Sequence, residues 1–358
     1  MKISVIIPAY EPDEKMVAFI DSLIKNSFED IIVVDDGSSA AAGRYFDEAK
    51  KRPGVTVLVH EVNRGKGAAL KTAFSYLAEN RPDSDGAACA DADGQHTAES
   101  IKTCLKAYEE NPGCVILGGR DFNKGNIPAR SVFGNKLSSF VYRFAVGIKL
   151  GDTQTGLRII PPEYFTLFAG LKGNRYEYET QMLIAIGNNK IPYREVPIET
   201  IYIEGNESSH FNPVKDSIRI YAVVLKYFIK FAASSLSSYL IDIAIYAIIL
   251  FLIENKVSTG VQVFVCTVVS RVLSSIFNFT MNRKTVFKAT DNLWGTTIKY
   301  YTLMVCQMTA SYLLVFLFTD ILKVSGALQL IIKAVVDVVL FLFGYQIQRA
   351  WVFKNKKD

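Results

Sequence analysis

The sequence has few of the residues that build disulfide frameworks or zinc sites. Its five cysteines are odd in number, none forms a C-x-x-C pair, and there are only three histidines. This argues against a disulfide scaffold or a zinc centre, and we expect reduced, mostly buried cysteines. The net charge is only +5, and no basic face interleaved with aromatic residues is present. Nucleic acid is therefore excluded as an expected partner.

Long apolar runs are missing from residues 1–212 but dominate residues 231–353. The N-terminus has no signal-peptide pattern, because its first apolar run stops at Pro8 and acidic residues follow. We therefore expect a cytoplasmic soluble domain over residues 1–212, a membrane domain over 231–353 and a basic tail over 354–358.

Short apolar runs that suit buried strands alternate with helical patterns in the first hundred residues. The predicted strands are 3–7, 30–34, 55–60 and 86–90, and the predicted helices are 16–25 and 68–79. This alternation predicts an α/β domain with a mostly parallel sheet covered on both faces. In such a sheet, ligands bind at the carboxyl ends of the strands.

Polar motifs follow three of these strands. They are Asp35-Asp36-Gly37-Ser38-Ser39, Asn63-Arg64-Gly65-Lys66-Gly67 and Asp91-Ala92-Asp93-Gly94-Gln95-His96. Each motif alone fits an ordinary turn, but their coincidence at successive strand ends favours one binding crevice. The second motif is not a P-loop, because it lacks the spacing and the following hydroxyl. Its Lys66 is still expected near phosphate.

A metal site is predicted at the third motif. Asp91, Asp93 and Gln95 alternate on an extended segment, so their oxygens can approach one hard cation from the same side. A divalent cation there would bridge the two phosphates of a nucleotide sugar and neutralise the leaving diphosphate.

Further motifs complete a family pattern: Pro8-Ala9-Tyr10, Gly118-Gly119-Arg120, Arg130 and Asp152-Thr153-Gln154-Thr155-Gly156-Leu157-Arg158. Together they resemble glycosyltransferase family 2, in its dolichyl- or polyprenyl-phosphate sugar transferase branch, over roughly residues 1–225. The resemblance implies a GT-A fold, a Rossmann-like mixed sheet that binds nucleotide-diphospho-sugars. It also implies Mg²⁺ or Mn²⁺, a nucleotide-sugar donor, a polyprenyl-phosphate acceptor and inversion at the anomeric carbon.

The resemblance assigns roles to single residues. Donor binding is implied for Pro8, Tyr10, Glu11, Asp36, Lys66 and Asp91, and catalysis for Asp93, Arg120, Arg130 and Asp152. Arginine suits phosphates because its planar donors match their oxygens and stay charged, although Arg130 equally fits a solvated loop charge. A lipid phosphate is already anionic, so its attack needs little general base. Asp152 is the candidate for a base or sugar-positioning role, and equally fits a turn cap.

Two segments depart from the family pattern. The usual Pro-Ala-Tyr-Asn-Glu start reads Pro-Ala-Tyr-Glu-Pro here, so Glu11 is displaced by one position. Residues 204–211 replace the Arg and the Ser-Lys pair that relatives place there. The acceptor phosphate is then predicted to contact Arg130, His210, Lys215 and Arg219. A lone loop histidine is also compatible with a purely structural role.

Four apolar stretches reach the length of about 20 residues that crosses a bilayer: about 231–253, 258–280, 301–322 and 326–347. The loop charges set their orientation. Basic residues lie before the first stretch and after the second and fourth: Lys226, Lys230, Arg283, Lys284, Lys288, Arg349, Lys354, Lys356 and Lys357. The positive-inside rule therefore predicts four spans with both termini in the cytoplasm, in a bacterial plasma membrane by our interpretation.

The membrane half contains an internal repeat. Residues 277–287 and 343–353 share aromatic residues at the first and third places, Arg at the seventh and Val-Phe at the end. Each lies at the cytoplasmic end of an even-numbered span, as a duplicated two-helix unit requires. These residues resemble the GtrA-like membrane domain, a four-helix domain associated with polyprenyl-phosphate sugars and proposed to help move them across the bilayer.

Four charged residues lie within the predicted spans, where each costs about 2.5–3.5 kcal/mol at a helix centre: Asp242, Arg271, Lys333 and Asp337. Lys333 and Asp337 are four residues apart and can pair. A second hypothesis is a polar path or lipid-phosphate site involving Arg271. Residues 213–230 predict a basic amphipathic helix, either at the membrane interface or buried on the soluble domain.

The sequence thus predicts transfer of a hexose, from a UDP-sugar rather than GDP-mannose, to polyprenyl phosphate for cell-envelope glycosylation, with the membrane domain aiding flipping. A processive polysaccharide synthase is an alternative, but its Q-x-x-R-W motif fits Gln346–Trp351 only with one extra residue. A non-catalytic lipid-sugar transporter is another alternative, and the intact Asp91-Ala92-Asp93 motif speaks against it. Assembly into a homo-oligomer is left open.

Overall fold

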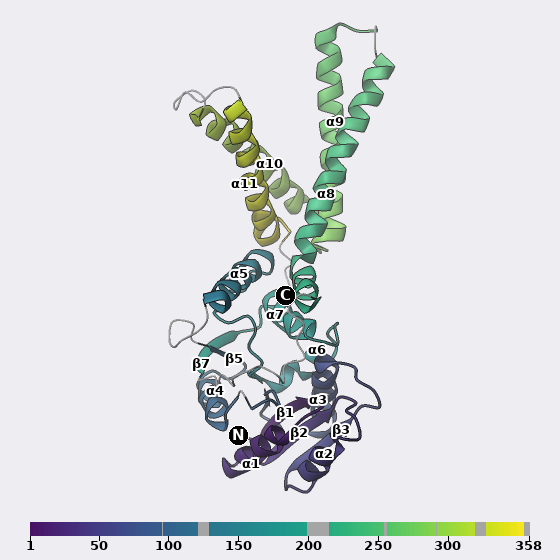
Figure 1. Cartoon of the computed structure of the whole chain (residues 1–358). Coiled ribbons are helices and arrows are strands. Elements are labelled where there is room, and N and C mark those ends of the chain that lie inside the picture. The colour runs from purple at the N-terminus through teal and green to yellow at the C-terminus, as the bar shows by residue number, and fades with distance from the viewer. Residues whose placement is uncertain are drawn as a thin grey trace. The chain divides into compact units, whose positions relative to one another are not determined.

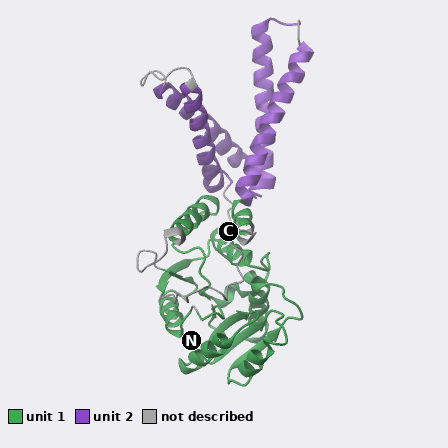
Figure 2. Ribbon diagram, in the orientation of Figure 1, with its two compact units in different colours: residues 1–225 green, residues 226–358 purple. Residues whose placement is uncertain are grey.

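The computed structural model describes residues 1–94, 96–120, 129–198, 215–253, 256–290, 292–318 and 327–353. The chain divides into two compact units, Met1–Leu225 and Lys226–Asp358 (Figure 2). Among the predicted site residues, Gln95 and His210 lie outside the described residues. The side chains of Arg130, Lys215 and Arg219 do so as well.

The first unit contains a seven-stranded mixed sheet with the order β3-β2-β1-β4-β6-β5-β7. Its strands are β1 (Ile3–Ala9), β2 (Asp30–Asp35), β3 (Val55–Val59), β4 (Gly86–Cys89), β5 (Val115–Arg120), β6 (Arg158–Ile160) and β7 (Tyr193–Ile198). All neighbouring strands are parallel except β6, which is antiparallel to β4 and β5. The predicted mostly parallel sheet is therefore confirmed.

Helices cover both faces of this sheet (Figure 1). One apolar core packs α1 (Glu14–Lys25), α2 (Gly43–Lys50) and α4 (Ala98–Glu110) on one face. A second core includes α3 (Lys66–Asn80), α5 (Ala129–Ala145), α6 (Phe165–Ala169) and α7 (Glu177–Asn189). Strand side chains such as Val33 and Val34 point alternately into the two cores, so the strands read as continuous apolar runs.

The antiparallel strand β6 shapes the edge where ligands are expected. Cys89 of β4 and Leu117 of β5 both pair with Arg158, the first residue of β6. Because β6 runs in the opposite direction, the segment 152–157 before it reaches the same sheet edge as the carboxyl ends of β4 and β5.

The second unit is helical. It continues α8 (Lys215–Ile253) and adds α9 (Thr259–Met281), α10 (Leu293–Phe316) and α11 (Ala327–Ile347). Within the described ranges, three segments are long and apolar enough to cross a membrane: Ile220–Ile253, Thr259–Val286 and Leu328–Val352. Lys299, Gln307 and several hydroxyl side chains interrupt the apolar residues of α10. The predicted count of four spans is therefore not confirmed.

The two repeat segments of the second unit contact each other reciprocally. Each ends in a π-helical turn, Asn282–Val286 and Gln348–Val352. Equivalent positions of the two repeats contact each other: Asn282 Nδ2 lies 3.1 Å from Gln348 Oε1, and the Phe287 and Phe353 ring centroids are 5.1 Å apart. Two contacts between non-equivalent positions also mirror each other, Phe279–Phe353 at 5.9 Å and Phe287–Tyr345 at 6.0 Å. Such reciprocity is what a two-fold relation between two copies produces.

The predicted intramembrane charges are paired. Asp242 of α8 lies 3.6 Å from Arg271 of α9 and accepts a hydrogen bond from Ser274 at 3.1 Å. Lys333 and Asp337 of α11 pair at 2.6 Å, which confirms that they share one helix face. Ser311 of α10 donates to Asp337 at 3.0 Å. In each helix pair, a serine therefore donates to the aspartate of an ion pair.

The predicted interfacial helix at 213–230 corresponds to the start of α8. Val224 is fully buried, and Ile220, Val223 and Leu225 pack against the core of the first unit. This segment therefore covers the soluble domain with part of its apolar face. A contact between this segment and lipid stays a prediction.

Candidate active site

A cleft of about 810 Å³ opens at the carboxyl ends of β1, β2 and β4. Its lining includes all six residues predicted to bind the donor, Pro8, Tyr10, Glu11, Asp36, Lys66 and Asp91, together with Asp93. Arg175 and Tyr176, the two residues just before α7 (Glu177–Asn189), complete one side. Residues from distant parts of the chain thus meet in one cleft.

Lys66, the first residue of α3, lies between two carboxylates. Its Nζ atom is 2.7 Å from Asp91 Oδ1 and 3.1 Å from Glu179 Oε1. Burial alone would lower the pKa of Lys66, but the two carboxylates outweigh burial and hold that pKa above its ordinary value. Burial also opposes ionisation of Asp91, yet Lys66 and then His96 keep the pKa of Asp91 below its usual range. Both partners are therefore charged at neutral pH.

Buried groups hold the Asp91 carboxylate in place. A Cβ atom at position 156 would lie 2.6 Å from Asp91 Oδ2, so Gly156 is what allows this close approach. Arg158 is fully buried and donates to the backbone oxygens of Thr155 and Glu179, at 3.2 and 3.0 Å. Its positive charge favours the ionised form of Asp91.

Asp36 supports the loop that leads into α3. Its carboxylate accepts hydrogen bonds from the backbone N–H groups of Arg64 and Gly65, at 3.0 and 2.6 Å, and lies 2.7 Å from His60 Nδ1. Gly65 has a φ of 100°, and a Cβ atom there would lie 2.4 Å from the carbonyl oxygen of Asn174. Asp36 and this glycine together fix the loop, and a nucleoside contact of Asp36 stays a prediction.

Glu11 also joins two loops. Its carboxylate accepts hydrogen bonds from the Ser39 backbone N–H at 2.6 Å and from the Ser39 hydroxyl at 2.9 Å. Its own N–H donates to Ser38 Oγ at 3.0 Å. The displaced glutamate therefore ties the loop after β1 to the loop after β2.

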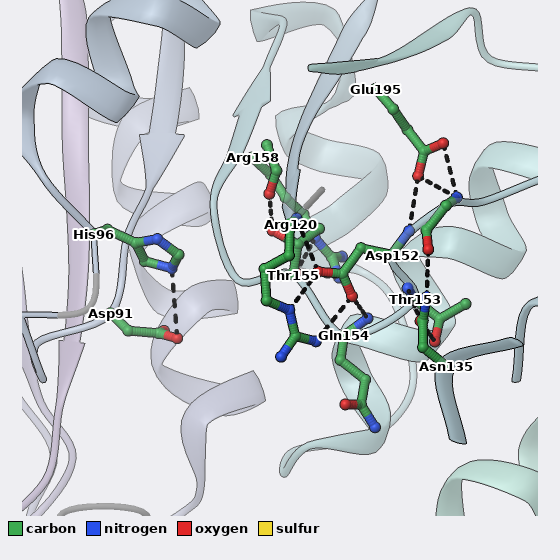
Figure 3. Close-up of polar contacts among 12 residues, drawn as sticks. Asp91, His96, Arg120, Asn135, Asp152, Thr153, Gln154, Thr155, Arg158 and Glu195 are labelled. Atoms are coloured by element: carbon green, nitrogen blue, oxygen red, sulfur yellow. Dashed lines mark hydrogen bonds and ion pairs between the residues drawn. The ribbon is translucent and has the colours of Figure 1, made fainter. Parts of the chain in front are cut away.

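Arg120 and Asp152 form a second polar group at the same sheet edge (Figure 3). Arg120 Nε is 2.8 Å from Asp152 Oδ2 and its Nη2 atom is 3.0 Å from Oδ1, a bidentate pair. Asp152 is buried. Glu195 accepts from the backbone N–H groups of Gly151 and Asp152, at 2.7 and 3.2 Å. This network orients the guanidinium at the end of β5.

Each of the two units matches a known protein family. Residues 4–167 match the model of glycosyl transferase family 2, and residues 230–353 match the GtrA/DPMS transmembrane domain. An uncharacterized protein of Methanocaldococcus jannaschii is 30% identical over 217 residues, which span 60% of this chain and 87% of that protein. The chain belongs to glycosyl transferase family 2. The predicted resemblance is thus confirmed, and the protein is a glycosyltransferase with a GT-A-like mixed sheet.

Two further relatives carry functional names. The UDP-N-acetylglucosamine–dolichyl-phosphate N-acetylglucosaminyltransferase of Methanococcus voltae is 29% identical over 219 residues, 56% of this chain and 86% of that one. The dolichyl-phosphate β-glucosyltransferase of Dictyostelium discoideum is 27% identical over 248 residues, 61% of this chain and 73% of that one. Both names describe sugar transfer to a polyprenyl phosphate.

The cleft of this glycosyltransferase fits a divalent cation only in combination with a substrate. In the part of the chain that the structure describes, no three His, Cys, Asp or Glu side chains are grouped to hold a metal ion. Asp91 and Asp93 both line the cleft, but Asp91 Oδ1 is paired with Lys66. Mg²⁺ is commonly held by one or two carboxylates plus substrate phosphates. Asp93 and Asp91 Oδ2, which lies 3.9 Å from His96 Nε2, suit that mode.

Sequence reasoning missed the contribution of α7. Glu179 pairs with Lys66, and Arg175 and Tyr176 line the cleft. These residues follow no strand, so the search at strand ends could not find them. The usable signal was two acidic residues in the first turn of a helix, Glu177 and Glu179, shortly after the basic Arg175.

Proposed function

We propose that this enzyme transfers a sugar from a nucleotide-sugar donor to a polyprenyl phosphate, with inversion, at the cytoplasmic face of a membrane. The observation that carries the proposal is the acidic cleft around Asp91, Asp93 and Lys66 in a chain that also carries a transmembrane domain. A volume of about 810 Å³ is within the range of small-molecule sites. The names of the relatives support the acceptor class.

The donor would lie along the cleft. Pro8 and Tyr10 at the end of β1 would contact the nucleoside, and the diphosphate would lie near Asp91, Asp93 and Lys66. A divalent cation, Mg²⁺ or Mn²⁺, held by the two aspartates would neutralise charge on the leaving diphosphate. Lys66 adds a permanent positive charge. We favour a UDP-hexose as donor.

The acceptor would be positioned rather than deprotonated. A phosphate monoester is anionic at neutral pH, so its oxygen attacks without a strong general base. Both oxygens of Asp152 accept hydrogen bonds from Arg120, which favours a positioning role for Asp152. Arg120 would then stabilise negative charge on the reacting phosphates. Aid in flipping the product by the membrane domain remains a separate prediction.

The test is direct transfer with the purified full chain. The protein is incubated with polyprenyl phosphate, Mg²⁺ or Mn²⁺ and separately labelled UDP-glucose, UDP-N-acetylglucosamine and GDP-mannose, and the label is followed into the organic phase. Label from one donor, reduced in Asp93→Asn at the same metal concentration, supports the proposal and names the sugar. Transfer only to a sugar acceptor, with none to the lipid phosphate, would overturn it in favour of a polysaccharide synthase.

A further inference from the structure

Three of the described residues that line the cleft are basic, and they differ in how strongly they are already engaged: Lys15, Lys66 and Arg175. The Lys66 ammonium lies between Asp91 and Glu179, at 2.7 and 3.1 Å, so two carboxylates already share its charge. The diphosphate of a nucleotide sugar would bring further negative charge beside these carboxylates. A second cation near Asp91 would therefore favour its binding.

Lys15, in the first turn of α1, takes part in a weak ion pair. Its Nζ atom lies 3.6 Å from Asp13 Oδ2, and the two side chains are 40% and 49% exposed. Exposed ion pairs of this kind add little to stability, because water competes for both charges. The other oxygen of Asp13 caps the helix by accepting a hydrogen bond from the Lys15 backbone N–H at 2.9 Å. This cap does not need the ammonium, so Lys15 can turn toward a bound anion at little cost.

Lys15 lies next to the segment that is predicted to hold the metal and the diphosphate. A Cβ atom at Gly94 would lie 3.9 Å from Lys15 Cβ, so the lysine stem is beside the residue that follows Asp93. The flexible four-carbon stem of lysine lets its ammonium reach the space around Asp93. Arg175 lies instead against Gly65, where a Cβ atom would be 2.7 Å from Arg175 Cγ. Lys15 is therefore the better placed of the two for a ligand at Asp93.

The chain departs from the family pattern on this side of the cleft. The last residue of the usual Pro-Ala-Tyr-Asn-Glu start is replaced by Pro12, which lines the cleft without a charge. The carboxylate of the neighbouring Glu11 is bound to Ser39, accepting from its backbone N–H at 2.6 Å and from its hydroxyl at 2.9 Å. A neutral residue thus stands where the family has a glutamate. The positive charge of the nearby Lys15 is therefore available for a ligand.

We propose that Lys15 binds the diphosphate of the nucleotide-sugar donor. It would supply the positive charge beside Asp93 that Lys66, shared by two carboxylates, does not. The inference rests on the proposed donor class and adds to it a contact outside the motifs at the strand ends. An ammonium is a compact charge with three N–H donors, which suits phosphate oxygens. Because Lys15 would contact the phosphates and not the base, its effect should be the same for uridine and guanosine nucleotides.

The experiment compares how the full chain binds nucleoside diphosphates and the nucleosides that lack phosphate. Calorimetric titrations with UDP and GDP are made in excess Mg²⁺, and uridine and guanosine are titrated as the phosphate-free counterparts. Lys15→Gln removes the charge, and Lys15→Arg keeps it. Lys25→Gln is the matched control, because Lys25 is an exposed lysine in the last turn of the same helix.

We expect Lys15→Gln to weaken diphosphate binding about tenfold or more, the scale of a lost hydrogen bond to a charged group, and to leave nucleoside binding unchanged. Lys15→Arg should retain most of the affinity, and Lys25→Gln all of it. Undiminished diphosphate binding by Lys15→Gln overturns the inference alone and leaves the donor class intact. An equal loss for diphosphate and nucleoside also overturns it, because the residue then acts through the shape of the cleft. If the wild-type protein binds neither UDP nor GDP, the proposed function fails and the inference fails with it.

Discussion

The guanidinium of Arg120 contacts the buried carboxylate of Asp152 through two hydrogen bonds, of 2.8 and 3.0 Å. This pair joins the end of β5 to the loop before β6. It also fixes the Arg120 guanidinium at the sheet edge that carries Asp91. A bidentate pair between a buried carboxylate and a partly exposed arginine acts mainly by orienting the arginine, since both oxygens of the carboxylate accept hydrogen bonds from it.

Replacing Asp152 by asparagine should therefore affect both stability and turnover. Asp152 is buried and Arg120 is partly exposed, so the loss is that of hydrogen bonds to a charged group, about 1.5–3 kcal/mol. We expect Asp152→Asn to lower the melting temperature and kcat. Asp83→Asn breaks an exposed pair with Lys2 and should change neither. Normal kcat with a lowered melting temperature would limit Asp152 to a structural role.

Glu179 should matter for donor binding although it is not part of any predicted motif. Glu179→Gln removes one of the two carboxylates around Lys66, so the ammonium should move wholly to Asp91 and compete with the cation and diphosphate. Hydrogen bonds to charged groups contribute about 1.5–3 kcal/mol, so kcat/KM for the donor should fall about tenfold or more. Glu110→Gln, at an exposed position at the end of α4, is the control. Equal kinetics in the two variants would refute this role.

Much of the site was predictable, because the carboxyl ends of parallel strands lie at the same edge of the sheet and bring the residues that follow them together. Asp91 and Asp93 follow β4 and Lys66 follows β3, and parallel strands place their carboxyl ends at one edge. The partners of these residues were not predictable. Asp36 was expected at the nucleoside, but its oxygens accept backbone N–H groups from the loop after β3, a contact that depends on three-dimensional loop paths.

The face that a helix buries is equally hard to read from sequence. The spacing of Phe133, Leu137 and Phe140 is that of an ordinary core-facing stripe. Only the packing of Asn135 and Tyr142 shows that the polar face is the buried one. In the membrane unit, the repeat was visible in the residue pattern, whereas the contact of Asn282 with Gln348 required the fold.

Removal of divalent cations should stop transfer. Asp93 and Asp91 line the cleft, and in the described residues no third acidic side chain is grouped with them to hold a metal, so the cation is expected to depend on the diphosphate for further oxygens. Excess EDTA should abolish label transfer, and Mg²⁺ or Mn²⁺ should restore it. Asp93→Asn should raise the metal concentration needed for half-maximal rate. Full activity in EDTA would contradict a metal-dependent mechanism.

Glu195 should make stability depend on pH. Its burial raises its pKa above the usual 4.5, against the opposing effect of the Asp152 and Gly151 N–H groups. The folded state then binds a proton more tightly than the unfolded state, so stability falls as pH rises from about 4.5 through the raised pKa. Glu195→Gln keeps an acceptor oxygen and cannot ionise. Its melting temperature relative to wild type should therefore rise with pH, and a constant difference would argue against the shift.

Variants of the Asp242–Arg271 ion pair can distinguish two roles for Arg271. It either contacts a lipid phosphate along a polar path or only neutralises the charge of Asp242. Arg271→Leu leaves the Asp242 carboxylate with Ser274 alone, at a cost of about 2.5–3.5 kcal/mol within a bilayer. Asp242→Asn combined with Arg271→Leu removes both charges and should recover most of that stability. If Arg271 contacts a lipid phosphate during translocation, the double variant will be stable but will still fail to deliver labelled lipid-linked sugar to the opposite leaflet of a vesicle. If the pair is only structural, the stable double variant will translocate normally, and the path must be sought elsewhere in the domain.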